Sequence, residues 1–228
     1  MTLAILYASI FSILLPIAFW IQKYFKLQSY FLTILGALLL LSAASDTASY
    51  VLAMLGKPAD VILNIFFVLQ FALLAALYVY FLPKRKLFVY SGIALFLLCF
   101  FVVTPRYQSI QEYQSITRTV GGILLLGFSM LYYASLFTDS HVQQVTLYAP
   151  FWINSAVFVY FGFSLYLFVT STYVFEHATP QEAMIFWSFH NTNNILKNII
   201  YAVGIYKYTS LKGSLRLHRP TIVREEMV

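Results

Sequence analysis

Runs of about twenty predominantly apolar residues recur along most of this chain. A helix needs about twenty such residues to cross a bilayer, and only helices and closed barrels satisfy every backbone hydrogen bond there. Of the 228 residues, 61% are hydrophobic and only 10% are charged, whereas a soluble domain has about 25% charged residues. The sequence therefore predicts an all-α integral membrane bundle.

Seven apolar runs predict seven transmembrane helices. Their expected bounds are Thr2 to Ile21, Tyr30 to Met54, Asp60 to Leu82, Leu87 to Val103, Thr119 to Phe137, Leu147 to Ser171 and Ala183 to Tyr206. No basic region precedes the first run, so we expect a retained span and not a cleaved signal peptide. We expect residues 1–208 to form one transmembrane domain, and residues 209–228 to form a short basic tail.

Lysine and arginine predict the orientation of the bundle. When alternate loops are assigned to opposite sides, ten of the fourteen fall on one side: Lys23, Lys26, Lys84, Arg85, Lys86, Lys207, Lys212, Arg216, Arg219 and Arg224. By the positive-inside rule the N-terminus is outside and the C-terminus is cytoplasmic, as in a multi-pass protein of a bacterial inner membrane. We expect the basic tail to contact anionic lipid headgroups and not nucleic acid.

Local signals mark where two helices begin. Thr179, Pro180 and Glu182 are spaced as an N-cap, a first-turn proline and a capping-box glutamate for the seventh span, and Pro150 lies where the sixth span begins. The polar outer loop from Thr104 to Ser115 is expected to be a flexible connection, with a lid as the alternative.

Polar residues inside three spans are expected to face one another. On the seventh span, His190, Asn194, Lys197 and Tyr201 are spaced 4, 3 and 4 and form one stripe, with Asn191 and Asn198 beside it. On the second span, Ser42, Ser45, Asp46 and Ser49 share one face. The third span adds Asn64 and Gln70, whose spacing of six residues puts them on different faces.

Charge in the bilayer interior needs a partner or water. Two uncompensated charges would cost roughly 5 to 7 kcal/mol on insertion scales, so we expect an ion pair between Asp46 and Lys197, with His190 and Asn194 completing the network. His190 is the residue expected to respond to pH. For the serines and single asparagines we expect hydrogen bonds that hold helices together. For the three ionisable residues we expect a function.

Motifs for catalysis and metal binding are absent from the sequence. There is no His-Glu-x-x-His, no Gly-x-Ser-x-Gly and only one cysteine, Cys99, so we expect neither an enzyme nor a metal centre or cofactor. A buried lysine in the last of seven helices is also found in microbial rhodopsins, which would make Lys197 a retinal carrier. In that family the counter-ion lies on the third helix, whereas Asp46 is on the second.

Two stretches carry a closer resemblance. They are Tyr148 to Ile153 with the following Tyr160-Phe161-Gly162, and Phe186 to Asn198. Together with Ser45-Asp46, they resemble a bacterial family of seven-span proteins of unknown function. Members of that family resemble, or accompany, the membrane portions of sensor histidine kinases. The resemblance implies a seven-helix fold and signalling, and it identifies no ligand.

These observations favour a non-enzymatic membrane sensor with a polar pocket between the second, third and seventh spans. The pocket would receive a small ligand or protons, and output would pass to a partner such as a histidine kinase or through homo-oligomerisation. The alternative is a small-solute or proton-coupled transporter with Asp46, His190 and Lys197 as a relay. The absence of inverted repeats weighs against transport.

Overall fold

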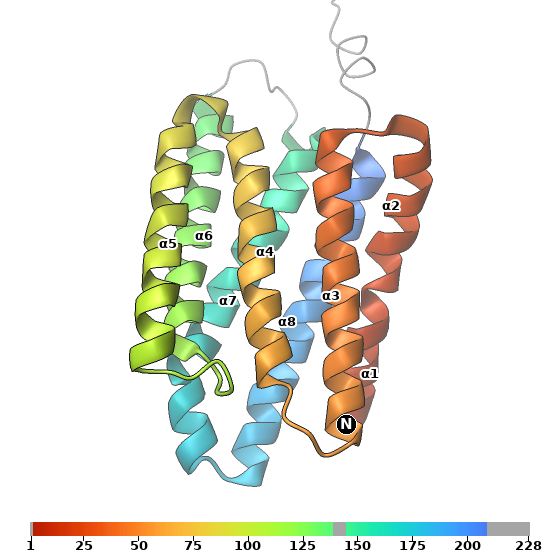
Figure 1. The fold of residues 1–228 in the computed structure, drawn as a ribbon. Coiled ribbons are helices and arrows are strands. Elements are labelled where there is room, and N and C mark those ends of the chain that lie inside the picture. Colours follow the sequence, from red (N-terminus) through yellow and green to blue (C-terminus); the bar gives the residue numbers. More distant parts are fainter. Residues whose placement is uncertain (1, 139–144, 209–228) are drawn as a thin grey trace, which may run out of the picture.

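The structure is a computed structural model that describes residues 2–138 and 145–208. Within these residues the chain forms a helical bundle without strands (Figure 1). The α-helices are α1 (Thr2–Ser12), α2 (Leu14–Leu27), α3 (Tyr30–Met54), α4 (Asp60–Phe81), α5 (Lys86–Arg106), α6 (Ser115–Thr138), α7 (Ala149–His177) and α8 (Pro180–Lys207). Two short 3-10 turns, Pro83–Arg85 and Val145–Leu147, precede α5 and α7. The basic tail predicted for residues 209–228 lies outside the described residues.

The predicted first span consists of two helices joined at Ile13. Pro16, in the first turn of α2, has no backbone N–H to donate to the carbonyl of Ser12, so the regular helical bonding is interrupted there. The pair together extends to Leu27, six residues beyond the predicted end. The six additional residues include Lys23 and Lys26, whose long stems allow an apolar helix to continue to a polar surface.

The number of membrane-crossing helices is six or seven. Six segments of the described chain are long and apolar enough to span, with α1 and α2 counted together. The remaining helix, α8, has 28 residues but carries the polar run of the seventh predicted span. The outer surface of the bundle is apolar, as on α5, where Leu87, Leu98 and Phe101 are 62 to 80% exposed. Such a surface suits a multi-pass membrane protein.

The two ends of the bundle differ in charge. One end, called the basic end here, carries Lys23, Lys26, Lys84, Arg85, Lys86 and Lys207 at the α2–α3 connection, the α4–α5 connection and the end of α8 (Figure 1, upper end). At the other end, called the open end, lie the start of α1, the loops 55–59 and 107–114 and the short α7–α8 connection. For the described connections, the predicted alternation between the two ends is thus confirmed.

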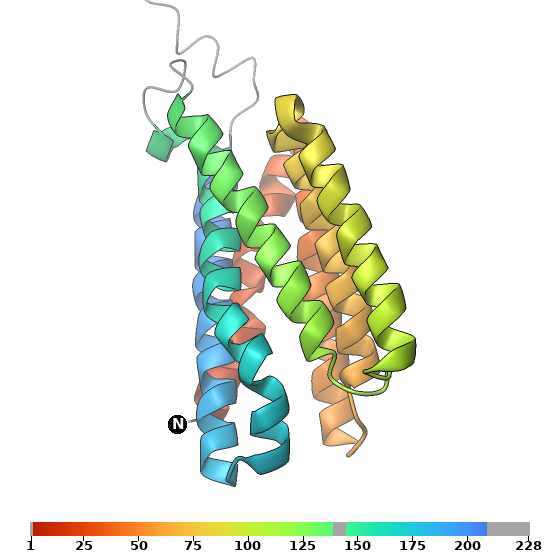
Figure 2. The same cartoon turned by 90° about the vertical axis from the view of Figure 1, so that its left-hand side faces the viewer.

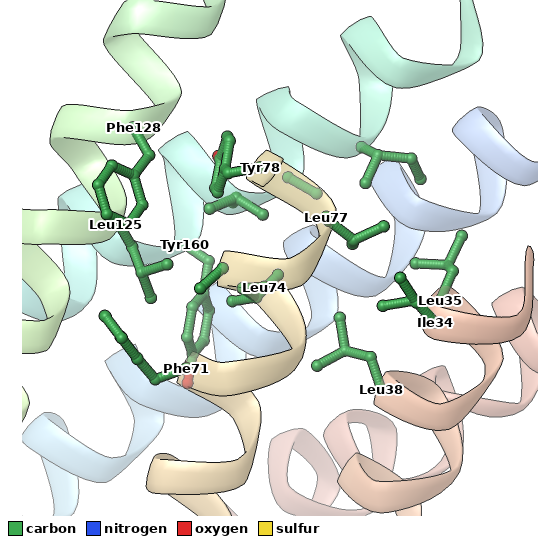
Figure 3. Packing of buried hydrophobic residues seen from close by; sticks show 14 of the residues in the cluster. Ile34, Leu35, Leu38, Phe71, Leu74, Leu77, Tyr78, Leu125, Phe128 and Tyr160 are labelled. Atoms are coloured by element: carbon green, nitrogen blue, oxygen red, sulfur yellow. The ribbon is translucent and has the colours of Figure 1, made fainter. Parts of the chain in front are cut away.

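A layer of apolar side chains fills the bundle between its middle and the basic end. In Figure 3, α4 lies at the centre of this layer, with α3 on one side and α6 on the other. The layer contains Ile34, Leu35, Leu38, Phe71, Leu74, Leu77, Tyr78, Leu125 and Phe128. Seen from the side, α6 runs obliquely across the bundle (Figure 2). The polar side chains that line the cavities described below lie between this layer and the open end.

Candidate functional site

The start of α8 is fixed by the capping box that the sequence predicts. The Glu182 backbone N–H donates to the Thr179 hydroxyl oxygen at 3.3 Å, and the Glu182 carboxylate accepts from the Thr179 backbone N–H at 2.8 Å. Pro150 likewise lies in the first turn of α7. These caps set where the two helices begin, and so which residues face the bundle.

Asparagines attach α8 to α7 and to α1. The Asn193 side-chain amide donates to the Tyr160 carbonyl at 2.9 Å and to the Ser164 hydroxyl at 3.0 Å. Asn198 donates to the Ser12 hydroxyl at 2.7 Å. These bonds agree with the structural role predicted for single asparagines.

A wide cavity, called the vestibule here, opens at the open end of the bundle. Its volume is about 1080 Å³, and its walls come from α1, α3, α4, α7, α8 and the loop 107–114. Its acidic residues are Asp46, Asp60, Glu112 and Glu176, half of the eight in the whole chain. Among the described residues no lysine or arginine lines it. The vestibule is therefore an acidic space.

A much smaller cavity, the inner pocket, continues from the vestibule toward the middle of the bundle. It measures about 60 Å³ and is lined by polar residues from five helices, namely Ser42, Asp46, Gln70, Arg118, Tyr160, His190, Asn194 and Lys197. Asp46, His190 and Asn194 line both cavities, as do Leu63, Tyr113 and Trp187. The polar residues predicted on α3, α4 and α8 thus share this lining with residues of α6 and α7.

The expected ion pair between Asp46 and Lys197 is not formed. Within residues 2–138 and 145–208 the only oppositely charged groups closer than 4 Å are His177 and Glu176, at 3.9 Å. The Lys197 ammonium lies instead 4.5 Å from the centre of the Tyr160 ring, a distance typical of a cation–π contact. The prediction was wrong because α8 packs mainly against α7, α2 and α1, so that the cavity separates it from α3.

Asp46 and Lys197 nevertheless face the same space. Both line the inner pocket, and the carboxylate of Asp46 interacts electrostatically with the Lys197 ammonium and with the side-chain amide of Asn194. That amide also donates to the Ser9 hydroxyl at 3.1 Å. Counting back from Met54 at 1.5 Å per residue, Asp46 lies about 12 Å inside α3.

Arg118 is the buried charge that the sequence prediction missed. The fifth span was predicted to begin at Thr119, which left Arg118 in an outer loop, but Arg118 lies in the first turn of α6 with only 7% of its surface exposed. Its guanidinium donates to the Asn64 side-chain oxygen at 3.1 Å and lies over the rings of Phe67 and Tyr113, 5.2 and 4.4 Å from their centres. Its Nε has no hydrogen-bond partner among the described residues.

A signal for Arg118 was present in the sequence. Arg118, Gly121, Gly122 and Leu125 are spaced 3, 1 and 3, which places the arginine on one helical face with two glycines and a leucine. All four prove to be buried. Counting lysine and arginine by loop did not use this periodicity, so the prediction treated Arg118 as an exposed charge.

The loop 107–114 lines the vestibule and is hydrogen-bonded to α4 and α6. The Asn64 amide nitrogen donates to the carbonyl oxygens of Ile110 and Glu112, at 2.9 and 2.7 Å. The Gln108 amide oxygen accepts from the backbone N–H of Ile116 at 3.1 Å. The amide nitrogen of Asn64 thus donates to the loop, while its side-chain oxygen accepts from Arg118.

The other predicted site residues have different positions. His190 lies in the wall shared by both cavities, edge-on to the rings of Tyr160 and Trp187. Ser49 and Asn191 line the vestibule, and Ser42 and Gln70 line the inner pocket. Ser45 and Tyr201 are buried but line neither cavity. Tyr201 belongs to the hydrophobic core.

Several side chains near the cavities are not fully bonded. The Ser42 hydroxyl donates to the Leu38 carbonyl at 2.9 Å, whereas the buried hydroxyls of Ser45 and Ser49 have no partner in the described part of the chain. Two ionisable residues well inside their helices, Asp46 and Lys197, would cost roughly 5 to 7 kcal/mol without compensation on insertion scales, and the buried Arg118 in the first turn of α6 adds to this cost. A domain's entire stability is about 5 to 15 kcal/mol.

The cavity sizes limit what could bind. The inner pocket around Lys197 is far smaller than the 300 to 1000 Å³ of typical small-molecule sites, so its size does not favour a retinal chromophore on this lysine. The vestibule has the volume of a small-molecule site. Among the described residues, no cluster of three or more His, Cys, Asp or Glu side chains could hold a metal ion.

Comparisons of this chain with protein-family models, with curated proteins and with solved structures found no match. The chemistry of the two cavities is therefore the basis for any assignment.

Proposed function

We propose that this protein is a receptor-like membrane sensor, without enzymatic activity, that binds a small polar ligand in the vestibule and inner pocket. The observation that carries the proposal is a wide cavity that narrows onto three charged side chains, Asp46, Arg118 and Lys197. Small-molecule sites are typically concave with a few convergent polar groups. Ionisable residues within membrane spans are costly, and they usually mark functional sites.

The proposal includes an orientation and a location. With the basic end on the cytoplasmic side, as the positive-inside rule requires, the vestibule opens to the outside of a bacterial inner membrane. A ligand would then reach the inner pocket from the periplasm.

The output of the sensor would travel along α8. This helix contributes His190, Asn194 and Lys197 to the cavities and continues to Lys207 at the basic end. Shifts of one helix against its neighbours by 1 to 2 Å are a common means of signalling across a structure. The receiver would be a partner protein, and the resemblance to kinase-associated proteins suggests a histidine kinase. A second copy of the chain is the other option.

Ligand-dependent stabilisation tests the proposal. Protein in lipid nanodiscs is heated with a panel of amines, amino acids, carboxylates and sugars at a fixed high concentration, and the melting temperature is recorded. A ligand that binds only the folded state at 100 times its Kd stabilises by about 2.7 kcal/mol. We expect stabilisation by one chemical class, lost in Asn194→Leu, whose side chain lines both cavities. Stabilisation by no class, at any pH, would contradict a ligand sensor.

Thiol labelling tests which side the vestibule faces. In a Cys99→Ser background, Ser188→Cys places a thiol in the vestibule wall and Lys84→Cys places one at the basic end. A membrane-impermeant maleimide added to whole cells with a permeabilised outer membrane should modify the first and not the second. The reverse result would overturn the orientation.

Protons are the alternative stimulus, with His190 as the responsive group. The same nanodisc measurement from pH 5 to pH 8, with and without His190→Gln, separates protons from ligands. A melting temperature whose pH profile is unchanged by His190→Gln would exclude this residue as the sensor.

Transport is the second candidate, because a cavity open at one end is also one state of an alternating-access cycle. Proteoliposomes loaded with any stabilising ligand decide between the two functions. Flux that is abolished by Asp46→Asn would favour a transporter, whereas binding without flux would favour the sensor.

A further inference from the structure

We infer that the inner pocket is a site for the carboxylate of a zwitterionic ligand, such as an amino acid, whose amine stays in the vestibule. The inference rests on the proposed function and specifies the ligand class. It follows from the distribution of charge between the two cavities and from two buried cations that have no carboxylate in contact.

The two cavities have opposite charge. The inner pocket is lined by Arg118, Lys197 and one carboxylate, that of Asp46. The vestibule is lined by Asp46 and three further carboxylates, with no described lysine or arginine. A ligand that spans both cavities therefore meets positive charge at its inner end and negative charge along its outer part. This order matches a molecule with a carboxylate at one end and an ammonium group further out.

Neither cation of the inner pocket is in direct contact with a carboxylate of the described residues. Arg118 and Lys197 are 93 and 96% buried, and neither lies within 4 Å of a described carboxylate. The Lys197 ammonium contacts a tyrosine ring, and the Nε of Arg118 has no hydrogen-bond partner. Buried charges in proteins are normally paired, and the inner pocket has two cations but only one carboxylate, that of Asp46, so a second carboxylate would balance its charge.

Arg118 is held in place before any ligand arrives. One nitrogen of its guanidinium donates to Asn64, whose amide is itself fixed by two carbonyls of the loop 107–114. The rings of Phe67 and Tyr113 lie against the guanidinium. A planar guanidinium fork binds a carboxylate through two parallel hydrogen bonds, and a fixed fork loses little freedom when it does so.

Size also selects the ligand. A pocket of about 60 Å³ admits a carboxylate, a chloride ion or a few waters, since one water occupies about 30 Å³ of the liquid. The rest of the ligand must stay in the vestibule, where Trp187 and Tyr107 join the carboxylates of Asp60 and Glu112. Aromatic faces and carboxylates together are a favourable environment for an ammonium group.

Three matched probes test the inference: 4-aminobutanoate, butanoate and butylamine. Each is titrated into the full chain in nanodiscs, and binding is measured by calorimetry and by melting temperature. We expect the zwitterion to bind at least tenfold more tightly than either single-charge analogue. A series from glycine to 6-aminohexanoate then finds the preferred separation of the two charges. Equal affinity for zwitterion and amine would overturn the carboxylate site.

Charge-removing variants locate the two ends of the ligand. Arg118→Gln should lower the affinity for 4-aminobutanoate and for butanoate at least tenfold and leave the affinity for butylamine unchanged. Glu112→Gln should weaken the binding of 4-aminobutanoate and butylamine and leave the binding of butanoate unchanged. Arg106→Gln removes an exposed arginine at the same end and should change nothing. If Arg118→Gln does not fold, Arg118→Lys keeps the charge without the fork and should still weaken butanoate.

Two outcomes separate this inference from the proposed function. Stabilisation by chloride relative to gluconate, without binding of any amino acid in the series, would make the inner pocket an inorganic anion site and overturn the zwitterion. A neutral or purely cationic ligand that requires Asn194 and not Arg118 would also overturn it, yet would leave the receptor proposal intact.

Discussion

Gly121 on α6 lies beside the inner pocket and leaves no room for an added methyl group. A Cβ atom at this position would lie 2.8 Å from Cε1 of Phe67 and 3.0 Å from Cε2 of Phe96. Carbon atoms prefer separations of about 3.5 to 4.0 Å. Gly127, six residues further along the same helix, has no atom within 4 Å of such a Cβ. Gly121→Ala must therefore displace an aromatic ring, whereas Gly127→Ala displaces nothing.

The size of the effect follows from the difference between these two variants. Overpacking by one methyl group in a dense core costs about 1 to 3 kcal/mol. Replacing glycine by alanine within a helix gains up to about 1 kcal/mol, and this gain is common to both variants. We therefore expect Gly121→Ala to be less stable than Gly127→Ala by about 1 to 3 kcal/mol. For a chain of this size, that corresponds to a melting temperature lower by roughly 2 to 12 °C.

Both variants are purified in the same nanodiscs, and unfolding is followed by circular dichroism at 222 nm. Phe67 also lines the inner pocket and lies against Arg118, so Gly121→Ala should weaken carboxylate binding while Gly127→Ala does not. Equal melting temperatures for the two variants would mean that α4 and α6 do not approach each other as closely as the structure has them. The account of the pocket wall would then fail as well.

Three further predictions concern single interactions. The pKa of Glu182 is lowered from its ordinary value of about 4.5 by hydrogen bonds from Thr179, so its contribution to stability is present above that value and lost as the pH falls through the lowered pKa. Glu182→Gln should therefore reduce the melting temperature at pH 7 and not at pH 2. Tyr78→Phe leaves a buried amide oxygen on α7 without its 2.8 Å donor and should cost about 1 to 3 kcal/mol in denaturant unfolding. The stability losses of Asp46→Leu and Lys197→Met should be non-additive by at least about 0.5 kcal/mol in a double-mutant cycle, whereas additivity would mean that the two charges do not interact.

The sequence predicted the helices because each depends on local information. Apolar runs, the capping box at Thr179 and the proline at position 150 lie within a few residues of the features they determine. The break at Ile13 was also local, because Pro16 stands inside the first run. It was missed because the length of the run alone was used to predict one helix.

The site was predicted only in part, because its geometry depends on which helices are neighbours. Periodicity placed Asp46 and Lys197 on inward faces, and both do line one pocket. It did not show that α8 packs mainly against α7, α2 and α1, which decides whether the two charges touch. The same holds for Arg118, whose partner Asn64 comes from a different helix and is itself held by a loop.

The position of the cavities relative to the apolar layer limits how a ligand could act. The layer around Leu38, Leu74 and Phe128 closes the bundle between the inner pocket and the basic end, so a signal must pass through helix movement. On the basic side of the pocket, α8 is closely packed at Gly204, where an added Cβ would lie 2.7 Å from Ile153 of α7. Dense packing resists gradual deformation. A ligand that binds Lys197 is therefore expected to shift α8 as a rigid body along α7. This motion would reach the basic end without opening the apolar layer.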